Sequence, residues 1–302
     1  MIEATTLTRD LGGKWHGRSG SAACPVCQPE RRRDQNALSI ADGGNGRLLI
    51  YCHKAGCSFG DILKATGIKS GEYVPPDAAV FAKRAAEQKA LDAKKAKQAL
   101  ANWSTAQSIL NTAAEVYLRS RGITGTLPNT LRYHPSCWHA SAKRLPAMVA
   151  TIEGGNDFAV HRTYLSRDGH GKAKVDPVKA MLGAAAGGAV RLRLGPGPLM
   201  VGEGIESTLS ASILYDDPEM AVWAALSASG MARLNLPRLG GFGGFGNVRP
   251  SLIVAVDGDK AGRLAGHNLA ERAHAQGWHI DIMDPGDGAD WNDRLIKQEG
   301  NS

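Results

Sequence analysis

The pattern of apolar and polar positions over residues 1–70 is that of a small β module. Two strand-like patches, 36–40 and 47–52, flank the glycine-rich turn 42–46, and the segments around them are short and polar. Apolar patches bounded by clusters of Gly, Asn and Asp are typical of hairpins. We therefore expect strands and turns in this part of the chain.

A helical linker is predicted over residues 71–102. After the break at Pro75 and Pro76, the segment 78–101 is rich in Ala, Lys, Gln and Glu. These residues have high helix propensity, and such a composition indicates an exposed helix.

Residues 103–198 mix helical and strand patterns. The segment 103–122 is predicted as a helix that ends at Gly122, because glycine suits the left-handed position after a helix. Strand patterns follow at 147–152, 158–165 and 189–194. We expect a mixed, basic subdomain here.

The C-terminal part, residues 199–302, alternates short apolar runs with helical patterns. The order is strand, helix, strand, strand, helix, strand, helix. This alternation predicts a parallel α/β sheet, because parallel strands need crossover connections. The chain is thus expected to have a mixed α/β fold with four parts, at 1–70, 71–102, 103–198 and 199–302.

Charge is distributed unevenly along the chain. The net charge is +7 with a pI of about 9.2, and it amounts to about +10 over residues 61–200 but −6 over 201–302. A basic stretch suits a phosphate backbone, whereas an acidic stretch in a nucleic-acid enzyme needs cations to tolerate phosphate. We therefore expect a polyanionic partner for the middle of the chain.

The sequence gives no sign of a membrane partner. It has no apolar run of the roughly 18 residues that a membrane span requires. Residues 1–15 lack the apolar region of a secretory signal. These features predict a cytoplasmic protein.

Four cysteines have the spacing of a zinc site. Cys24 and Cys27 form a C-x2-C pair, and Cys52 and Cys57 return two more thiols after the predicted strand pair. Zinc favours four thiolate or imidazole ligands, and a small module can obtain its stability from the metal. A disulfide framework is the alternative, which a cytosolic location disfavours. His53, beside Cys52, stays open as a replacement ligand.

Acidic residues follow the predicted strands of the C-terminal part. Glu203 comes shortly after the strand 199–201, and Asp257 and Asp259 follow the strand 252–256. Ligands of open α/β sheets bind beyond the carboxyl ends of the strands. Carboxylates gathered there repel one another and are best explained by Mg²⁺ or Mn²⁺ held through oxygen ligands.

A third acidic cluster, Asp287, Asp290 and Asp293, follows the predicted strand 279–283. It would bring Asp290 to the same edge of the sheet as a further magnesium ligand. The alternative is that these acids are helix caps or solvated loop residues, which suits Asp287 or Asp293 taken alone.

Two nucleotide-binding signatures can be set aside. Residues 241–246 match G-x-G-x-x-G, but they precede a predicted strand instead of opening a helix after one, so they are no dinucleotide fingerprint. No G-x4-G-K-[ST] sequence is present, so we expect any helicase to be a separate partner.

Several motifs point to one family. Residues 202–206 read GEGIE and residues 257–262 read DGDKAG. They resemble the Toprim domain, the metal-binding fold shared by DnaG-type primases, topoisomerases and some nucleases. Residues 290–293, DWND, resemble the last acidic motif of primases encoded by phages, plasmids and integrative elements, and the four cysteines with His53 resemble the zinc finger of these primases. Further similarity covers 162–165, 172–173, 179–183 and 188–192.

The resemblance implies roles for individual residues. Glu203 would be a general acid or base or a metal ligand, and Asp257 and Asp259 would be the metal-binding pair. The lesser metal candidates are Glu206, Asp290 and Asp293. Basic residues ahead of the Toprim unit would hold template or nucleoside triphosphate, with simple surface solvation as the alternative for each. They are Arg162, Lys172, Lys174, Lys179, Arg191 and Arg193.

The function implied is that of a DNA primase. It would synthesise short RNA primers on single-stranded DNA from nucleoside triphosphates, with structural Zn²⁺ and catalytic Mg²⁺ or Mn²⁺. A Toprim nuclease needs a similar acidic cluster but no triphosphate, and a non-catalytic DNA-binding accessory protein of a mobile element needs no carboxylates. The zinc finger favours the primase, and substitution of the carboxylates separates the enzymes from the accessory protein.

Overall fold

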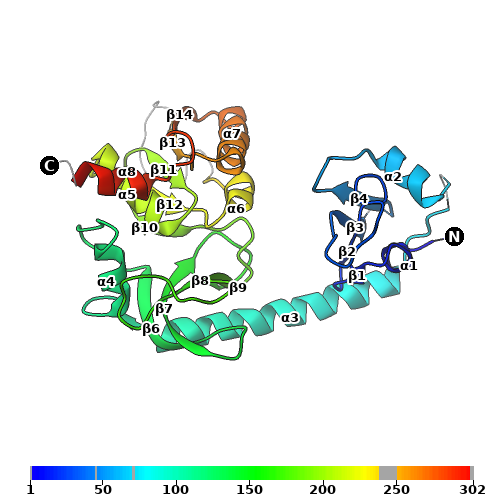
Figure 1. Cartoon of the computed structure of the whole chain (residues 1–302), viewed down its shortest axis with the longest axis horizontal. Coiled ribbons are helices and arrows are strands. Elements are labelled where there is room, and N and C mark those ends of the chain that lie inside the picture. The colour runs from blue at the N-terminus through cyan, green and yellow to red at the C-terminus, as the bar shows by residue number, and fades with distance from the viewer. Residues whose placement is uncertain (1, 45, 70–71, 238–249, 300–302) are drawn as a thin grey trace. The chain divides into compact units, whose positions relative to one another are not determined.

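The structure is a computed structural model that describes residues 2–44, 46–69, 72–237 and 250–299. The chain divides into two compact units, Met1–Leu91 and Asp92–Ser302, and Figure 1 labels most of their elements. The division falls within the long helix α3 (Ala78–Thr105). The glycine-rich segment 241–246 lies outside the described residues.

An antiparallel sheet with the strand order β1-β2-β3-β4 forms the first unit. Its elements are α1 (Ala4–Asp10), β1 (Lys14–Trp15), β2 (Ser19–Ala22), β3 (Leu38–Asp42), β4 (Leu48–Cys52) and α2 (Phe59–Thr66). The predicted hairpin is confirmed, since β3 and β4 pair across the glycine-rich turn. The small core contains Leu7, Leu38, Ile40 and Ile62.

Local signals set both ends of α2. Ser58 caps its start by accepting a hydrogen bond from the N–H of Asp61 at 3.1 Å. Gly67 ends it with a φ of 73°, which costs glycine little. Because the capping residue Ser58 directly follows Cys57, this cap also fixes the loop that carries that thiol.

Helix α3 is mostly exposed, as its composition predicts. Its buried residues are Ala96 and Ala99, and Ala99 packs with Val149. Nearer its start, Arg84 forms an ion pair of 2.6 Å with the buried carboxylate of Asp42. The prediction of an exposed helix is confirmed, with the end at Thr105 instead of about residue 101.

A second antiparallel sheet has the strand order β5-β6-β7-β8-β9. Its elements are β5 (Gln107–Ser108), α4 (Ala113–Arg119), β6 (Leu131–Trp138), β7 (Arg144–Ile152), β8 (Ala159–Tyr164) and β9 (Lys179–Gly183). The prediction of one helix over 103–122 is wrong. Asn111 has a left-handed φ of 60°, which a continuous helix does not accommodate, and Thr112 then caps α4 through the N–H of Ala114.

The third sheet has the strand order β10-β12-β11-β13-β14, in which β10 is antiparallel and the other four strands are parallel. Its elements are β10 (Val190–Arg193), β11 (Leu199–Gly202), α5 (Ile205–Tyr215), β12 (Ala221–Ala224), α6 (Ala228–Arg233), β13 (Ser251–Ala255), α7 (Lys260–Ala275), β14 (His279–Met283) and α8 (Trp291–Glu299). The predicted parallel sheet is confirmed, with the short helix α6 as an addition between β12 and β13.

One apolar core joins the second and third sheets. Leu131 and Met148 belong to the same buried cluster as Met200 and Ile253. In the third sheet Gly202 pairs with Ala255, so β11 and β13 end at the same edge. The residues that follow these two strands are therefore neighbours. In the described part of the chain, no helix is both long and apolar enough to span a membrane.

Candidate functional site

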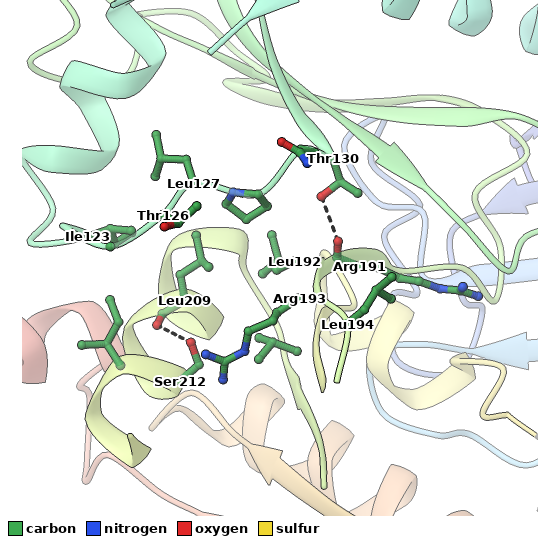
Figure 2. A pocket seen from close by; sticks show the side chains of 15 residues that line it. Ile123, Thr126, Leu127, Thr130, Arg191, Leu192, Arg193, Leu194, Leu209 and Ser212 are labelled. Atoms are coloured by element: carbon green, nitrogen blue, oxygen red, sulfur yellow. Dashed lines mark hydrogen bonds between the residues drawn. The ribbon is translucent and has the colours of Figure 1, made fainter. Parts of the chain in front are cut away.

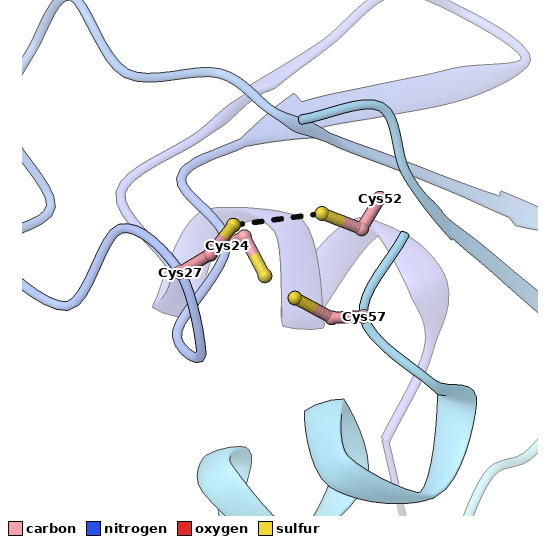
Figure 3. A group of neighbouring side chains, drawn as sticks. All are labelled: Cys24, Cys27, Cys52 and Cys57. Atoms are coloured by element: carbon pink, nitrogen blue, oxygen red, sulfur yellow. Dashed lines mark hydrogen bonds between the residues drawn. The ribbon is translucent and has the colours of Figure 1, made fainter. Parts of the chain in front are cut away.

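Four cysteine side chains converge in the first unit (Figure 3). Their sulfur atoms all lie within 4.8 Å of one another, and Cys27 Sγ is 3.6 Å from Cys52 Sγ. In a tetrahedral zinc site with Zn–S bonds of about 2.3 Å, the sulfurs are about 3.8 Å apart. The cluster of Cys24, Cys27, Cys52 and Cys57 therefore fits a zinc finger.

Backbone amides favour a thiolate in this cluster. Burial raises the pKa of Cys52, but the N–H groups of Lys54, Ala55 and Cys57 outweigh it and lower that pKa to about 6. Burial and the neighbouring sulfurs raise the pKa of Cys27 to about 12, because one thiolate disfavours a second beside it. A metal cation relieves this repulsion, so the donor set suits Zn²⁺.

His53 is engaged elsewhere. Its Nε2 lies 2.8 Å from Ser39 Oγ, and its ring packs edge-on against Tyr51. The group of described residues that could hold an ion contains Cys52 and not His53. The geometry therefore favours Cys52 as the partner of Cys57.

Acidic residues follow two adjacent parallel strands of the third sheet. Glu203 follows β11 and Asp257 follows β13, and both are half-buried. Asp259 is exposed and begins α7, where its Oδ1 accepts a hydrogen bond from the N–H of Gly262 at 2.6 Å. We call Glu203, Asp257 and Asp259 the acidic edge.

The carboxylates of the acidic edge repel one another. Burial raises the pKa of Glu203, and the charges of Asp257 and Asp259 raise it further. Burial also raises the pKa of Asp257, with further increases from Asp290 and Asp259. A hard divalent cation would relieve this repulsion, so the donor set suits Mg²⁺ or Mn²⁺.

The acids of the last cluster have local partners. Asp290 Oδ1 accepts a hydrogen bond from the N–H of Asp293 at 2.9 Å, and the N–H of Asp290 is 3.5 Å from Asp293 Oδ2, as in a capping box. The side chain of Asp287 is 95% exposed and pairs with Arg263 at 2.7 Å. Among the described residues, the acidic side chains form no group of three as close together as the cysteine sulfurs.

Two residues outside the predicted set hold Asp257 in place. Ser207 in α5 donates a hydrogen bond to Asp257 Oδ1 at 2.7 Å and accepts one from the N–H of Trp291 at 3.4 Å. The indole of Trp291 donates to the carbonyl of Val256 at 2.9 Å. The orientation of Asp257 thus depends on α5 and α8, and no sequence motif reveals their contacts with the residues that follow β13.

Glu206 is a buried carboxylate with three side-chain partners among the residues that the structure describes. Tyr117 donates to its Oε1 at 2.7 Å, Lys179 Nζ is 3.0 Å from its Oε2, and Lys172 Nζ is 3.7 Å from its Oε1. Burial raises the pKa of Glu206, but the two ammonium groups, a backbone amide and Tyr117 hold it well below its usual range. Glu206 is therefore ionised and already engaged, which makes it a poor metal ligand.

The predicted basic residues lie in different surroundings. The charge of Lys179 acts on Glu203 and Asp257 of the acidic edge. Arg162 points to the face of β8 opposite the neighbouring His161, is 8% exposed and donates to the carbonyl of Trp138 at 3.2 Å. Its place favours packing over contact with a template.

Arg191 and Arg193 line a cavity of about 620 Å³ beside α5 (Figure 2). Arg193 donates hydrogen bonds of 2.8 and 2.9 Å to backbone carbonyls ahead of β12. Arg191 pairs with Glu153 at 3.2 Å. Lys174 is exposed on the loop between β8 and β9.

Asn292 is a structural residue that the sequence does not reveal. It is 1% exposed, and its Oδ1 accepts a hydrogen bond from Arg121 at 2.9 Å. Its Nδ2 donates to Ser210 Oγ at 3.0 Å and to the carbonyl of Arg121 at 2.7 Å. It therefore joins α8 to α5 and to the segment that follows α4. In the sequence, only its place within the DWND motif could have drawn attention to it.

Solved structures of primases are similar at low identity. The zinc-binding and RNA polymerase domains of the Aquifex aeolicus primase match with a TM-score of 0.44 and 15% identity, over 97% of this chain and 79% of that one. The primase fragment of the bacteriophage T7 primase-helicase protein matches with 0.36 and 13%, over 92% and 98%. A DNA primase domain from Pseudomonas aeruginosa matches with 0.38 and 16%, over 69% and 74%. No curated protein shows a significant match.

Two family models match consecutive parts of the chain. Residues 93–192 match a domain of unknown function (DUF7146). Residues 198–302 match the Toprim domain, and this span contains the whole acidic edge. The C-terminal part of the chain is therefore a Toprim domain.

Proposed function

We propose that the protein is a DNA primase, a nucleotidyltransferase that makes short RNA primers on single-stranded DNA. The observation that carries this proposal is the acidic edge of a Toprim domain in a chain that also holds a four-cysteine cluster. Mutually repelling carboxylates suit bound divalent cations, and such cations suit the phosphates of a nucleotide.

In the proposed reaction, the 3′ hydroxyl of the primer attacks the α-phosphate of a nucleoside triphosphate, and the bond to pyrophosphate breaks. Mg²⁺ or Mn²⁺ bound at the acidic edge would neutralise phosphate charge. Glu203, whose pKa is raised, would accept the hydroxyl proton. Asp257, held by Ser207, and Asp259 would supply oxygen ligands, with Asp290 as a further candidate. Lys179 would contact a phosphate of the triphosphate.

The zinc module and the basic part that the sequence predicts would have separate roles in the reaction. Zn²⁺ in the four-cysteine cluster would stabilise the module at 1–70, which would hold template together with the basic part at 103–198. Within that part, Lys172 and Lys179 form ion pairs with Glu206 of the Toprim helix α5. Because the template is single-stranded, a separate helicase would open the duplex.

The test is primer synthesis on mixed-sequence single-stranded DNA with labelled nucleoside triphosphates and Mg²⁺ or Mn²⁺. We expect short products from the natural protein and a loss of at least about 100-fold in Asp257→Asn, because the removed charge matters most to the phosphates in the transition state. DNA binding should change little. The matched control is Asp281→Asn, an exposed aspartate of β14.

The other outcomes favour other functions. Cleavage of the DNA without primer synthesis, lost in the same variant, would favour a Toprim nuclease. DNA binding with neither reaction, unchanged in Asp257→Asn, would favour an accessory protein.

A further inference from the structure

Stability alone does not explain the buried carboxylate of Glu206. The residue is 6% exposed in the first turn of α5. Its partners come from three segments: Tyr117 from α4, Lys172 from the loop after β8, and Lys179 from the start of β9. Replacing a buried ion pair by apolar residues of similar volume is often neutral or stabilising. The buried charge of Glu206 is better explained by the side chains that it holds in position.

The two lysines of this network have different neighbours. Lys179 Nζ is 3.8 Å from the point that a Cβ on Gly204 would occupy, and Gly204 directly follows Glu203. The charge of Lys179 also acts on Glu203. Lys172 instead contacts Oε1 of Glu206, and its ammonium group lies within the electrostatic reach of Arg121. Lys179 is therefore the lysine placed next to the acidic edge.

The network is positive overall. One carboxylate faces two ammonium groups whose side chains are 31% and 33% exposed. A partly exposed cation beside a metal-binding edge suits a phosphate, which accepts a charge-assisted hydrogen bond and adds negative charge. Such a contact depends on the position of the ammonium group, because a flexible lysine side chain has many rotamers.

We propose that Glu206 is a positioning residue, which holds the ammonium group of Lys179 beside Glu203, where it contacts a phosphate of the nucleoside triphosphate. Tyr117 and Lys172 fix the carboxylate through its Oε1 and leave Oε2 to Lys179. The identity of the ligand rests on the proposed function. The placement of Lys179 can be tested without it.

Amine acylation followed by mass spectrometry tests this placement in the full-length, zinc-loaded protein without nucleotide. In Glu206→Gln we expect the acylation rate of Lys179 to rise at least about fivefold, because the charge-assisted hydrogen bond to Glu206 Oε2 makes the side-chain nitrogen less available to the reagent. The exposed Lys174 is the internal reference, and its rate should not change. An unchanged ratio of the two rates would overturn the proposal.

The consequence for the reaction is measured as KM and kcat for nucleoside triphosphates in primer synthesis. For Glu206→Gln we expect KM to rise about tenfold while kcat falls less than about threefold, as for the loss of a binding contact. Glu271→Gln, an exposed glutamate of α7, is the matched control and should change neither.

A double variant separates positioning from stability. Glu206→Gln combined with Lys172→Met removes one charge of each sign, so it should restore much of the thermal stability lost in Glu206→Gln. We expect KM to stay raised, because Lys179 still lacks its partner; recovery of KM together with stability would overturn the positioning role. If the natural protein makes no primer, the proposed function fails, while the acylation rates still decide the placement of Lys179.

Discussion

His161 is a buried histidine whose protonation opposes folding. It is 3% exposed in β8, and its Nδ1 has no hydrogen-bond partner among the described residues. Burial, and then the charge of Lys179, lower its pKa from 6.5 to about 4. Between these values the unfolded chain binds a proton that the folded chain does not. We expect neutral His161 to contribute on the order of 3 kcal/mol to the free energy of unfolding. This contribution is complete above pH 6.5, the pKa of the residue in the unfolded chain, and is lost as the pH falls to about 4, its pKa in the folded chain.

Urea unfolding at pH 7, 6 and 5 measures this dependence. His161→Gln cannot take up the proton, so its stability should fall less steeply on acidification than that of the natural protein. His274→Gln, an exposed residue of α7, should follow the natural protein. Equal slopes for His161→Gln and the natural protein would contradict the assignment to His161.

Also at the scale of residues, the sequence predicts the acids better than their partners. Glu203 and Asp257 can be found because each follows an apolar run that reads as a buried strand. Glu206 looks like a third acid of the same motif, yet its carboxylate binds lysines. The contact between Tyr117 and Glu206 joins positions 89 residues apart, so no local pattern reveals it.

Asp259 has two roles that can be separated: it caps the start of α7, and its charge belongs to the acidic edge. Asparagine at an N-cap keeps the hydrogen bond to Gly262, whereas alanine loses it at a cost of about 1 kcal/mol. We expect Asp259→Asn to keep thermal stability and lose at least about tenfold of primer synthesis. Asp259→Ala should lose thermal stability and primer synthesis, as thermal unfolding and primer assays would show. Natural activity in Asp259→Asn would exclude a role of the charge.

Elements with a strong local signal are the ones that the sequence predicts. The hairpin β3–β4 and the helix α3 need nothing beyond turn residues and helix propensity. Strand β6 is different, because Pro135 lies within its irregular pairing, between His134 and Cys137. Its residues become a strand through pairing with β7, which is a tertiary contact. Helix α6 has six residues and depends on the cap at Ser227.

At the scale of the whole molecule, the sequence shows where the composition of the chain changes, but not which parts of the chain share an apolar core. The division into four parts remains a prediction, whereas the structure groups the chain into Met1–Leu91 and Asp92–Ser302. The basic part and the Toprim part fall in one unit because Leu131 and Met200 share a core. Such a core joins distant positions, so a change of composition near residue 198 cannot indicate whether two parts pack together.

The unit Met1–Leu91 has a small core, so its stability should depend on zinc more than that of the second unit does. Removing zinc with a chelator under reducing conditions should cause the amides of β3 and β4 to lose protection in hydrogen exchange, while those of β7 and β8 in the second unit keep theirs. Cys52→Ser should behave as the chelated protein does, and Cys137→Ser, outside the cluster, should bind zinc normally. Protection of β3 and β4 that survives verified loss of zinc would mean that the apolar core folds this unit, and that the four thiols add a metal site to a module already stable without it.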